Sequence, residues 1–137
     1  ELREQFPGAA CEIAGQVMPG PCFAFDPWRF RPEAEALAGE GYAMVEYPQT
    51  DARMVPASQA LYEAILQGQI AHDGDPVLHR HVHNVVAEPR ERGWRISKPH
   101  GSLKKIDAAV GLAIAVERAQ HAPPAASVYE ERGLVVL

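Results

Sequence analysis

The sequence predicts an α/β fold, and three observations near its start carry that prediction. Residues 22–25 (CFAF) are a continuous apolar run closed by an Asp-Pro pair, the pattern of a strand buried on both faces of a parallel sheet. Residues 32–38 begin with a proline, contain strong helix formers and precede two glycines, as a short helix does. Residues 42–47 then predict a second strand. Strand, helix and strand in this order form a βαβ unit with a right-handed crossover.

The segment ahead of this unit predicts a weak helix. Residues 2–17 mix apolar and polar positions loosely at helical spacing, and the Pro-Gly-Pro run at 19–21 ends the pattern. The chain begins with Glu1 in what resembles the middle of a helix. We therefore expect it to be part of a longer protein.

Beyond the βαβ unit, the sequence predicts further helices and a hairpin. The turn at 72–76 (HDGDP) ends in a proline that opens a helix reaching about residue 86. Residues 93–97 predict a strand of a hairpin, 104–118 a helix, and 127–137 a tail that could add an edge strand. An amphipathic helix over 55–69 precedes them, with its apolar residues three and four apart: Ala57, Ala60, Leu61, Ala64 and Ile65.

Composition and charge narrow the class of protein. The 137 residues are enough for one domain, 1–137, and too few for two well-cored ones. Fractions of 47% hydrophobic and 23% charged residues are typical of a soluble globular protein. The net charge of −5 excludes a polycation that holds nucleic acid by bulk charge. The longest apolar stretch is far shorter than the roughly 20 residues of a membrane span.

The cysteines and the missing motifs exclude other classes. Cys11 and Cys22 form no CxxC motif, and with no evident secretory leader they favour a reducing compartment over a disulfide framework. The sequence also holds no glycine-rich phosphate loop and no GxSxG motif. These absences argue against a P-loop nucleotide hydrolase, the usual NAD-binding site and a serine hydrolase elbow.

Two aspartates are the main candidates for chemistry. Asp26 lies at the carboxyl end of the first strand, where open α/β sheets bind ligands, although an aspartate before proline also serves as a helix cap or turn residue. Asp107 lies in the first turn of the last helix, where the helix dipole alone favours a negative charge. The two can converge in an α/β fold and bind one or two Mg²⁺ or Mn²⁺ ions, which prefer carboxylate oxygens.

A local basic patch precedes Asp107 on this acidic chain. Between Pro89 and Lys105 the single acid is Glu91, and Trp94 lies among the basic residues. The segment predicts contacts with a DNA phosphate backbone, and a solvated hairpin is the alternative. Its six basic residues are Arg90, Arg92, Arg95, Lys98, Lys104 and Lys105.

Three histidines lie on the predicted helix that follows the HDGDP turn. His79 and His83 are four residues apart and share one helical face, a spacing that suits zinc, whereas His81 points away. No third ligand falls at metalloprotease spacing. We interpret these histidines as surface or nucleic-acid-facing residues, and a histidine-based zinc protein is a remote alternative.

Six short segments carry a resemblance to a known family. They are FDPWRF (25–30), GYAMVEYPQ (41–49), QGQIAHDGDPVL (67–78), VHNVV (82–86), KIDAAVGLAIA (105–115) and SVYEERGLVVL (127–137). In this order they resemble the C-terminal nuclease part of the large terminase subunits of tailed bacteriophages, from about residue 21 onward. The resemblance implies an RNase H-like fold, a mixed sheet flanked by helices, here without its first strands.

The resemblance also implies a metal-dependent endonuclease that cuts concatemeric viral DNA by a two-metal mechanism. Three acids form the metal site in that family. Asp26 matches the second and Asp107 the third, while the first is expected upstream of this chain. Loss of the first acid would impair metal binding by the chain alone, and nothing in the sequence shows that Glu46 or Asp73 replaces it. The HDG segment places His72 and Asp73 at the edge of the site.

The cofactor implied by the resemblance is Mg²⁺ or Mn²⁺. The implied partners are double-stranded DNA, the portal and the small terminase subunit, with no membrane. The implied location is the host bacterial cytoplasm, transiently at the procapsid portal. A degenerate, non-catalytic remnant that binds DNA or protein is the alternative, because the first acid is absent from this sequence.

Overall fold

The computed structural model describes residues 10–13 and 16–121, which fall into two compact units. The described part of the first unit ends at Glu46, and the second runs from Tyr47 to His121. The tail predicted at 127–137 and most of the predicted N-terminal helix lie outside the described residues. Within the described part, no helix is both long and apolar enough to cross a membrane. The assignment of 1–137 to a single domain stays a prediction.

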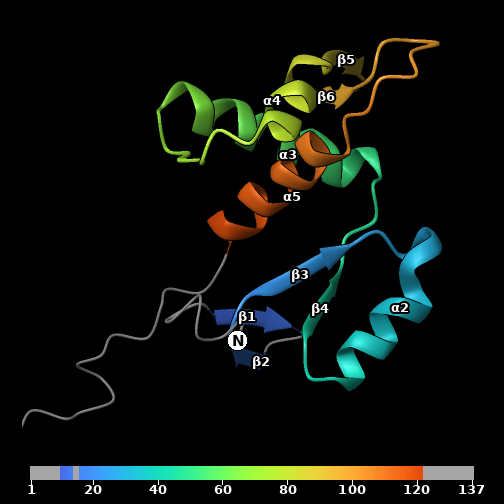
Figure 1. The fold of residues 1–137 in the computed structure, drawn as a ribbon, viewed down its shortest axis with the longest axis vertical. Helices are drawn as coiled ribbons and strands as arrows, with labels where there is room; N and C mark the ends of the chain where they lie inside the picture. Colours follow the sequence, from blue (N-terminus) through green and yellow to red (C-terminus); the bar gives the residue numbers. More distant parts are fainter. Residues whose placement is uncertain (1–9, 14–15, 122–137) are drawn as a thin grey trace, which may run out of the picture. The chain divides into compact units, whose positions relative to one another are not determined.

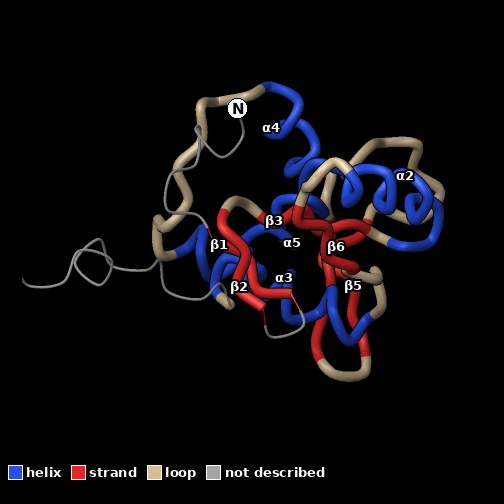
Figure 2. Tube along the Cα trace, turned by 90° about the horizontal axis from the view of Figure 1, so that it is seen from below, coloured by secondary structure: helices blue, strands red, loops and turns tan. Residues whose placement is uncertain are grey.

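The first unit opens with an antiparallel hairpin. β1 (Ala10–Ile13) and β2 (Gln16–Pro19) lie side by side (Figure 2), and their register pairs Cys11 with Met18. The helix predicted over 2–17 is therefore wrong where the structure describes that segment. Loosely spaced apolar residues in a short segment fit a strand as well as a helix, and here the pairing of the two backbones decides between them.

A disulfide bond joins Cys11 of β1 to Cys22, with the two Cα atoms 5.2 Å apart. The expectation that these cysteines form no disulfide is wrong. The β1–β2 hairpin folds the chain back on itself, so the start of the next strand returns to β1, and cysteine spacing alone does not reveal that return. The cysteines therefore no longer support a cytoplasmic location, which stays a prediction from the family resemblance.

The predicted βαβ unit is confirmed. β3 (Cys22–Phe25) and β4 (Ala43–Glu46) are parallel, with Phe25 opposite Glu46, and α2 (Pro27–Gly39) connects them (Figure 1). The residues of β3 are half-buried, so the expectation of a strand buried on both faces is wrong for the described residues. The unit places the carboxyl ends of both strands at the same edge.

Helix α2 begins at Pro27 rather than at Pro32, because Asp26 and Pro27 open it together. The Asp26 side chain accepts a hydrogen bond from the backbone N–H of Trp28, and Pro27 takes a first-turn position where a missing N–H costs little. Pro32 lies inside the helix, which continues past it. After the helix, Gly41 (φ 94°) turns the chain toward β4 in a left-handed conformation that favours glycine.

The second unit is built on α3 (Asp51–Leu66), which packs against β6 (Gly93–Ser97) and α5 (Asp107–Gln120). α4 (Pro76–His83) packs on α5. β5 (Val86–Arg90) pairs with β6 as the predicted hairpin. The three helices predicted in this unit are confirmed, with ends shifted by a few residues, since local signals define element ends poorly.

The buried face of α3 largely follows the predicted pattern. Ala57, Ala60, Leu61 and Ala64 are buried, but Ile65 is 51% exposed. Ile65 lies on the same side of the helix as Leu61 and Ser58, but in the last turn of α3, where it lines a pocket instead of packing in the core.

A buried serine joins this helix to the hairpin. Ser58 Oγ donates to the Met54 carbonyl (2.6 Å) and accepts from the backbone N–H of Ile96 in β6 (2.9 Å). Ser58 is fully buried, so the N–H of Ile96 depends on this hydroxyl for its hydrogen bond.

Tyr47, at the start of the second unit, is buried against the far end of α5. Its hydroxyl donates to the Arg53 carbonyl at 3.2 Å. Burial, reinforced by the nearby Glu117 carboxylate, raises the pKa of Tyr47 from 10.0 to about 12. Tyr47 therefore links the chain before α3 to the last turns of α5.

Candidate functional site

Asp26 follows β3 directly and caps α2. Its predicted place at the carboxyl end of the strand is confirmed, and so is the alternative that it serves as a helix cap. Its Oδ1 atom accepts the Trp28 N–H at 3.1 Å, and its backbone is extended. The cap uses one carboxylate oxygen. Among the described residues, none forms a hydrogen bond or ion pair with Oδ2, which is therefore available to a cation.

Glu46 lies at the same edge but has a structural partner. It forms an ion pair with Arg31 of α2, and its strand neighbour Phe25 contacts Phe30 of the same helix, with ring centroids 6.1 Å apart. Paired residues of neighbouring strands share a face of the sheet, so Phe25 and Glu46 both face α2. The structure thus gives no support to Glu46 as a replacement for the missing acid.

Asp107 lies in the first turn of α5, as predicted; it is the first residue of the helix and is exposed. Ile106 occupies the N-cap position before it and has no side-chain acceptor. Within the described part of the chain, the Asp107 carboxylate forms no hydrogen bond or ion pair. The positive end of the helix dipole favours a negative charge at this position. Both carboxylate oxygens are therefore available.

Two side chains at the end of α4 hold the backbone on either side of Asp107. Asn84 Nδ2 donates to the Lys105 carbonyl at 2.9 Å, and His81 Nδ1 accepts from the Ala108 N–H at 3.0 Å. Sequence reasoning missed Asn84 and noted His81 only as pointing away from the face that His79 and His83 share. The contacts join residues 21 and 27 positions apart, which no local pattern shows. The one available signal is a pair of polar residues spaced to share a helical face.

The two candidate acids lie in different units, and their convergence on a metal stays a prediction. Over residues 10–13 and 16–121, no three His, Cys, Asp or Glu residues are grouped so that they could hold a metal ion. The donor chemistry of Asp26 and Asp107 nevertheless fits Mg²⁺ or Mn²⁺, because each offers at least one carboxylate oxygen without a described partner.

The HDG segment forms a tight turn that leads into α4. His72 Nδ1 accepts from the Gly74 N–H (3.0 Å), and Asp73 Oδ1 accepts from the Asp75 N–H (3.1 Å). Asp75 in turn caps α4 by accepting from the Leu78 N–H (2.7 Å). These bonds give the segment a structural role, while the placement of His72 and Asp73 at the edge of a site stays a prediction.

His79 and His83 share one face of α4, as predicted. Their ring centroids are 4.2 Å apart, and His83 Nδ1 lies 3.0 Å from the His79 carbonyl oxygen. With His72, Leu78 and Leu112 they line a largely apolar pocket of about 440 Å³. The described residues supply no third ligand to a metal at this pocket, so the zinc alternative gains no support.

The basic patch is partly neutralised by acids that lie outside the segment from Pro89 to Lys105. Asp51, at the start of α3, pairs with Arg95 (2.9 Å) and Arg90 (3.3 Å), and Glu88 pairs with Arg90 (2.9 Å). Arg95 also donates to the Gln49 carbonyl. A count of six basic residues against Glu91 alone therefore overstates the local positive charge. Sequence reasoning missed Asp51 because it is far away along the chain.

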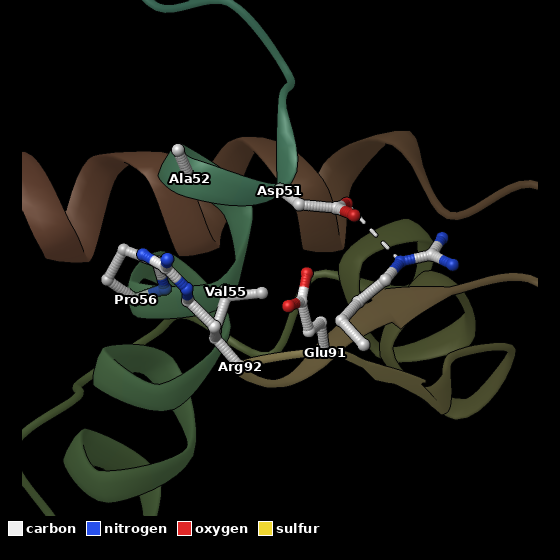
Figure 3. A pocket seen from close by; sticks show the side chains of 7 residues that line it. Asp51, Ala52, Val55, Pro56, Glu91 and Arg92 are labelled. Carbon is white, nitrogen blue, oxygen red and sulfur yellow. Dashed lines mark ion pairs between the residues drawn. The ribbon is translucent and has the colours of Figure 1, made fainter.

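A pocket of about 490 Å³ lies between the start of α3 and the β5–β6 turn (Figure 3). Asp51 and Val55 line it from α3, and Glu91 and Arg92 line it from the turn. The dashed line in Figure 3 marks the ion pair of Asp51 with Arg90. Asp51 thus connects the start of α3 to the hairpin, which gives Arg90 and Arg95 a role in the fold.

The other four candidate DNA-contact residues are exposed. Arg92 lies in the β5–β6 turn, and Lys98, Lys104 and Lys105 lie on the connection from β6 to α5, which extends away from the helices of its unit (Figure 1). In the part of the chain that the structure describes, none of the four forms an ion pair. Their contact with DNA stays a prediction.

Comparison with solved structures identifies a similar fold. The crystal structure of the HK97 bacteriophage large terminase matches with a TM-score of 0.59 and 26% sequence identity, covering 70% of this chain and 20% of that one. The chain thus spans about a fifth of the HK97 protein. The match confirms the α/β class, with small sheets flanked by helices, and is consistent with an RNase H-like fold. No curated protein matches the chain.

A family model gives the wider match. Residues 13–122 match the model of the terminase large subunit, endonuclease domain. This range is most of the chain and contains Asp26, Asp107 and all six predicted DNA-contact residues. The protein therefore belongs to the terminase large subunit endonuclease-domain family.

Proposed function

We propose that this chain is part of a metal-dependent nuclease that cleaves double-stranded DNA during phage DNA packaging. Asp26 and Asp107 are its metal ligands. The observation that carries the proposal is the state of these two carboxylates at helix starts within the matched range: Asp26 keeps one oxygen, and Asp107 both, without a described partner. The family match does not favour a non-catalytic remnant.

Asp26 and Asp107 would hold Mg²⁺ or Mn²⁺ through carboxylate oxygens. When bound, such an ion supplies Lewis acidity and activates water for phosphodiester hydrolysis. The chain contributes two negative charges, each next to the positive end of a helix dipole, which favours the ionised carboxylate that a metal needs. The family resemblance implies a third acid in the proposed two-metal site.

The exposed basic residues hold the DNA backbone in this proposal. Arg92, Lys98, Lys104 and Lys105 are the stronger candidates, because Arg90 and Arg95 are engaged by Asp51. Lys104 and Lys105 lie two and three residues before Asp107. Contacts to phosphates by lysine and arginine carry little sequence information, so we expect cleavage with little base specificity.

The family suggests the setting of the reaction. The protein would cut concatemeric viral DNA when packaging starts and ends, with the portal and the small terminase subunit as partners. It would act in the host cytoplasm, transiently at the procapsid portal.

Plasmid cleavage by the full-length protein in the presence of Mn²⁺ tests this function. Asp26→Asn and Asp107→Asn keep side-chain size and remove the charge, and each is expected to abolish cleavage while the circular-dichroism spectrum stays unchanged. Asp75→Asn is the matched control, because Asp75 caps α4 as Asp26 caps α2 and asparagine also caps helices. Retained cutting by either Asp26→Asn or Asp107→Asn would contradict the assignment.

A further inference from the structure

The start of α5 lacks a cap of its own. The first N–H groups of a helix have no partner within the helix, and a Ser, Thr, Asp or Asn at the N-cap position commonly accepts one of them. Here the N-cap residue is Ile106, whose side chain accepts nothing. The N–H of Ala108, in the first turn, instead bonds to His81 Nδ1 at 3.0 Å, and His81 belongs to another helix.

Asn84 fixes the chain on the other side of Asp107. Its Nδ2 donates to the Lys105 carbonyl at 2.9 Å. His81 and Asn84 are three residues apart at the end of α4, so they lie on neighbouring turns of one face. Together they bind the backbone two residues before and one residue after Asp107.

The helix that carries these two side chains is itself well anchored. Asp75 caps its first turn, a proline opens it, and α4 packs on α5. The backbone N–H of Asn84 also closes the last turn by bonding to the Arg80 and His81 carbonyls. The two contacts to α5 therefore come from a formed helix and not from a loose connection.

We infer that His81 and Asn84 are positioning residues for Asp107: His81 caps the start of α5 and Asn84 holds the Lys105 carbonyl ahead of it, which leaves the Asp107 carboxylate free to bind a metal ion. This inference rests on the proposed function. An aspartate that caps its own helix spends an oxygen on that helix, as Asp26 does with Trp28. At Asp107 the cap is supplied by His81, so neither oxygen is used.

The variants that test the cap either keep or remove the hydrogen-bond acceptor of His81 and the donor of Asn84. Nδ1 of His81 accepts a hydrogen bond, so the proton of the neutral ring is on Nε2. Asparagine places its Oδ1 at the same distance from the backbone as Nδ1, and His81→Asn therefore keeps an acceptor. His81→Leu removes the acceptor at similar size, and Asn84→Leu removes the donor to Lys105.

The first experiment measures the Mn²⁺ concentration that gives half-maximal plasmid cleavage by the full-length protein. We expect His81→Leu and Asn84→Leu to raise it by about tenfold or more, the range seen when groups that orient metal ligands are removed. His81→Asn should stay within about twofold of the wild type. His79→Leu is the matched control, because His79 lies on the same helix and contacts His83, and no described hydrogen bond joins its side chain to α5. A lower melting temperature with an unchanged Mn²⁺ requirement would show a merely structural role and overturn the inference.

The second experiment needs neither metal nor cleavage. Amide hydrogen exchange at Ala108 is expected to be slow in the wild type and in His81→Asn, and at least about tenfold faster in His81→Gln. Glutamine places its amide further from the backbone, so it no longer reaches the Ala108 N–H. Because it keeps a polar side chain at this position, His81→Gln also serves if His81→Leu does not fold. Equal exchange in all three proteins would overturn the cap. If the cap holds but the wild type neither binds Mn²⁺ nor cleaves DNA, the proposed function fails separately.

Discussion

Helices α2 and α5 each begin beside a candidate metal ligand, but the first N–H groups of the two helices are capped by different means. At α2, Asp26 is both the candidate metal ligand and the cap of its own helix, through a bond to a residue two positions away. At α5, Asp107 is not the cap: His81 of α4, 27 residues before Ala108, accepts the N–H of Ala108. One carboxylate is thus held by its own helix, and the other by the fold of the second unit.

The largest effect is expected on the cleavage rate when either aspartate is replaced by alanine, and the stability of the two variants distinguishes capping from metal binding. Asp26→Ala and Asp107→Ala should each lower the cleavage rate by about 100-fold or more, as loss of a key charged group does. The free energy of unfolding should differ between them. Asp26→Ala removes a cap at a cost of about 1 kcal/mol, whereas Asp107→Ala should change stability by only about 0.5 kcal/mol. Urea unfolding beside the cleavage assay measures both, and equal stability losses would contradict the comparison.

The burial of Tyr47 against the far end of α5 predicts a pH dependence of stability. The pKa of Tyr47 is raised to about 12 in the folded protein, so the folded state holds this proton more tightly than the unfolded chain does. The resulting stabilisation is complete below pH 10 and is lost as the pH rises from 10 to 12, by at most about 3 kcal/mol.

Urea unfolding at a series of pH values would show this loss in the wild type and a weaker one in Tyr47→Phe. Tyr62→Phe is the control, because Tyr62 is half-exposed. A pH dependence that Tyr47→Phe leaves unchanged would argue against the buried hydroxyl as its source.

The buried hydrogen bond between Ser58 and Ile96 is expected to contribute to the stability of the second unit. Ser58→Ala leaves the N–H of Ile96 without its acceptor in the core, and we expect a loss of about 1–3 kcal/mol in the free energy of unfolding. Gln59→Ala, at the exposed neighbouring position of α3, should cost far less. Chemical denaturation of both variants measures the difference, and similar losses would show that the Ser58 bond is not special.

The smallest effect concerns the basic residues near Asp107. Lys104→Ala should reduce the slope of log DNA affinity against log salt concentration by about 1, because one phosphate contact is lost. Arg95→Ala should leave the slope nearly unchanged, since Arg95 is engaged by Asp51. Binding titrations at several salt concentrations, without metal, compare the two. A larger change in the slope for Arg95→Ala than for Lys104→Ala would contradict the assignment of Lys104 to DNA binding and of Arg95 to the fold.

The same contrast explains what the sequence could predict. Local signals are sufficient for β3, the βαβ order and the place of Asp26, because an apolar run and an Asp-Pro pair act within a few residues. They fail at β1 and β2, where pairing between segments decides the structure. They also miss the Cys11–Cys22 bond, the His81 cap and the Asp51 ion pairs, because each joins residues that only the fold brings together.

The central proposal is that Asp26 and Asp107 are ligands of the same metal site. Iron-dependent cleavage of the protein backbone tests it directly: Fe²⁺ bound in place of Mn²⁺, with ascorbate and peroxide, generates radicals that cut the chain near the ion. The account predicts cuts close to both Asp26 and Asp107, which excess Mn²⁺ suppresses and which either Asp→Asn variant removes together. Cuts near only one of them, or cuts that persist in both variants, would contradict it.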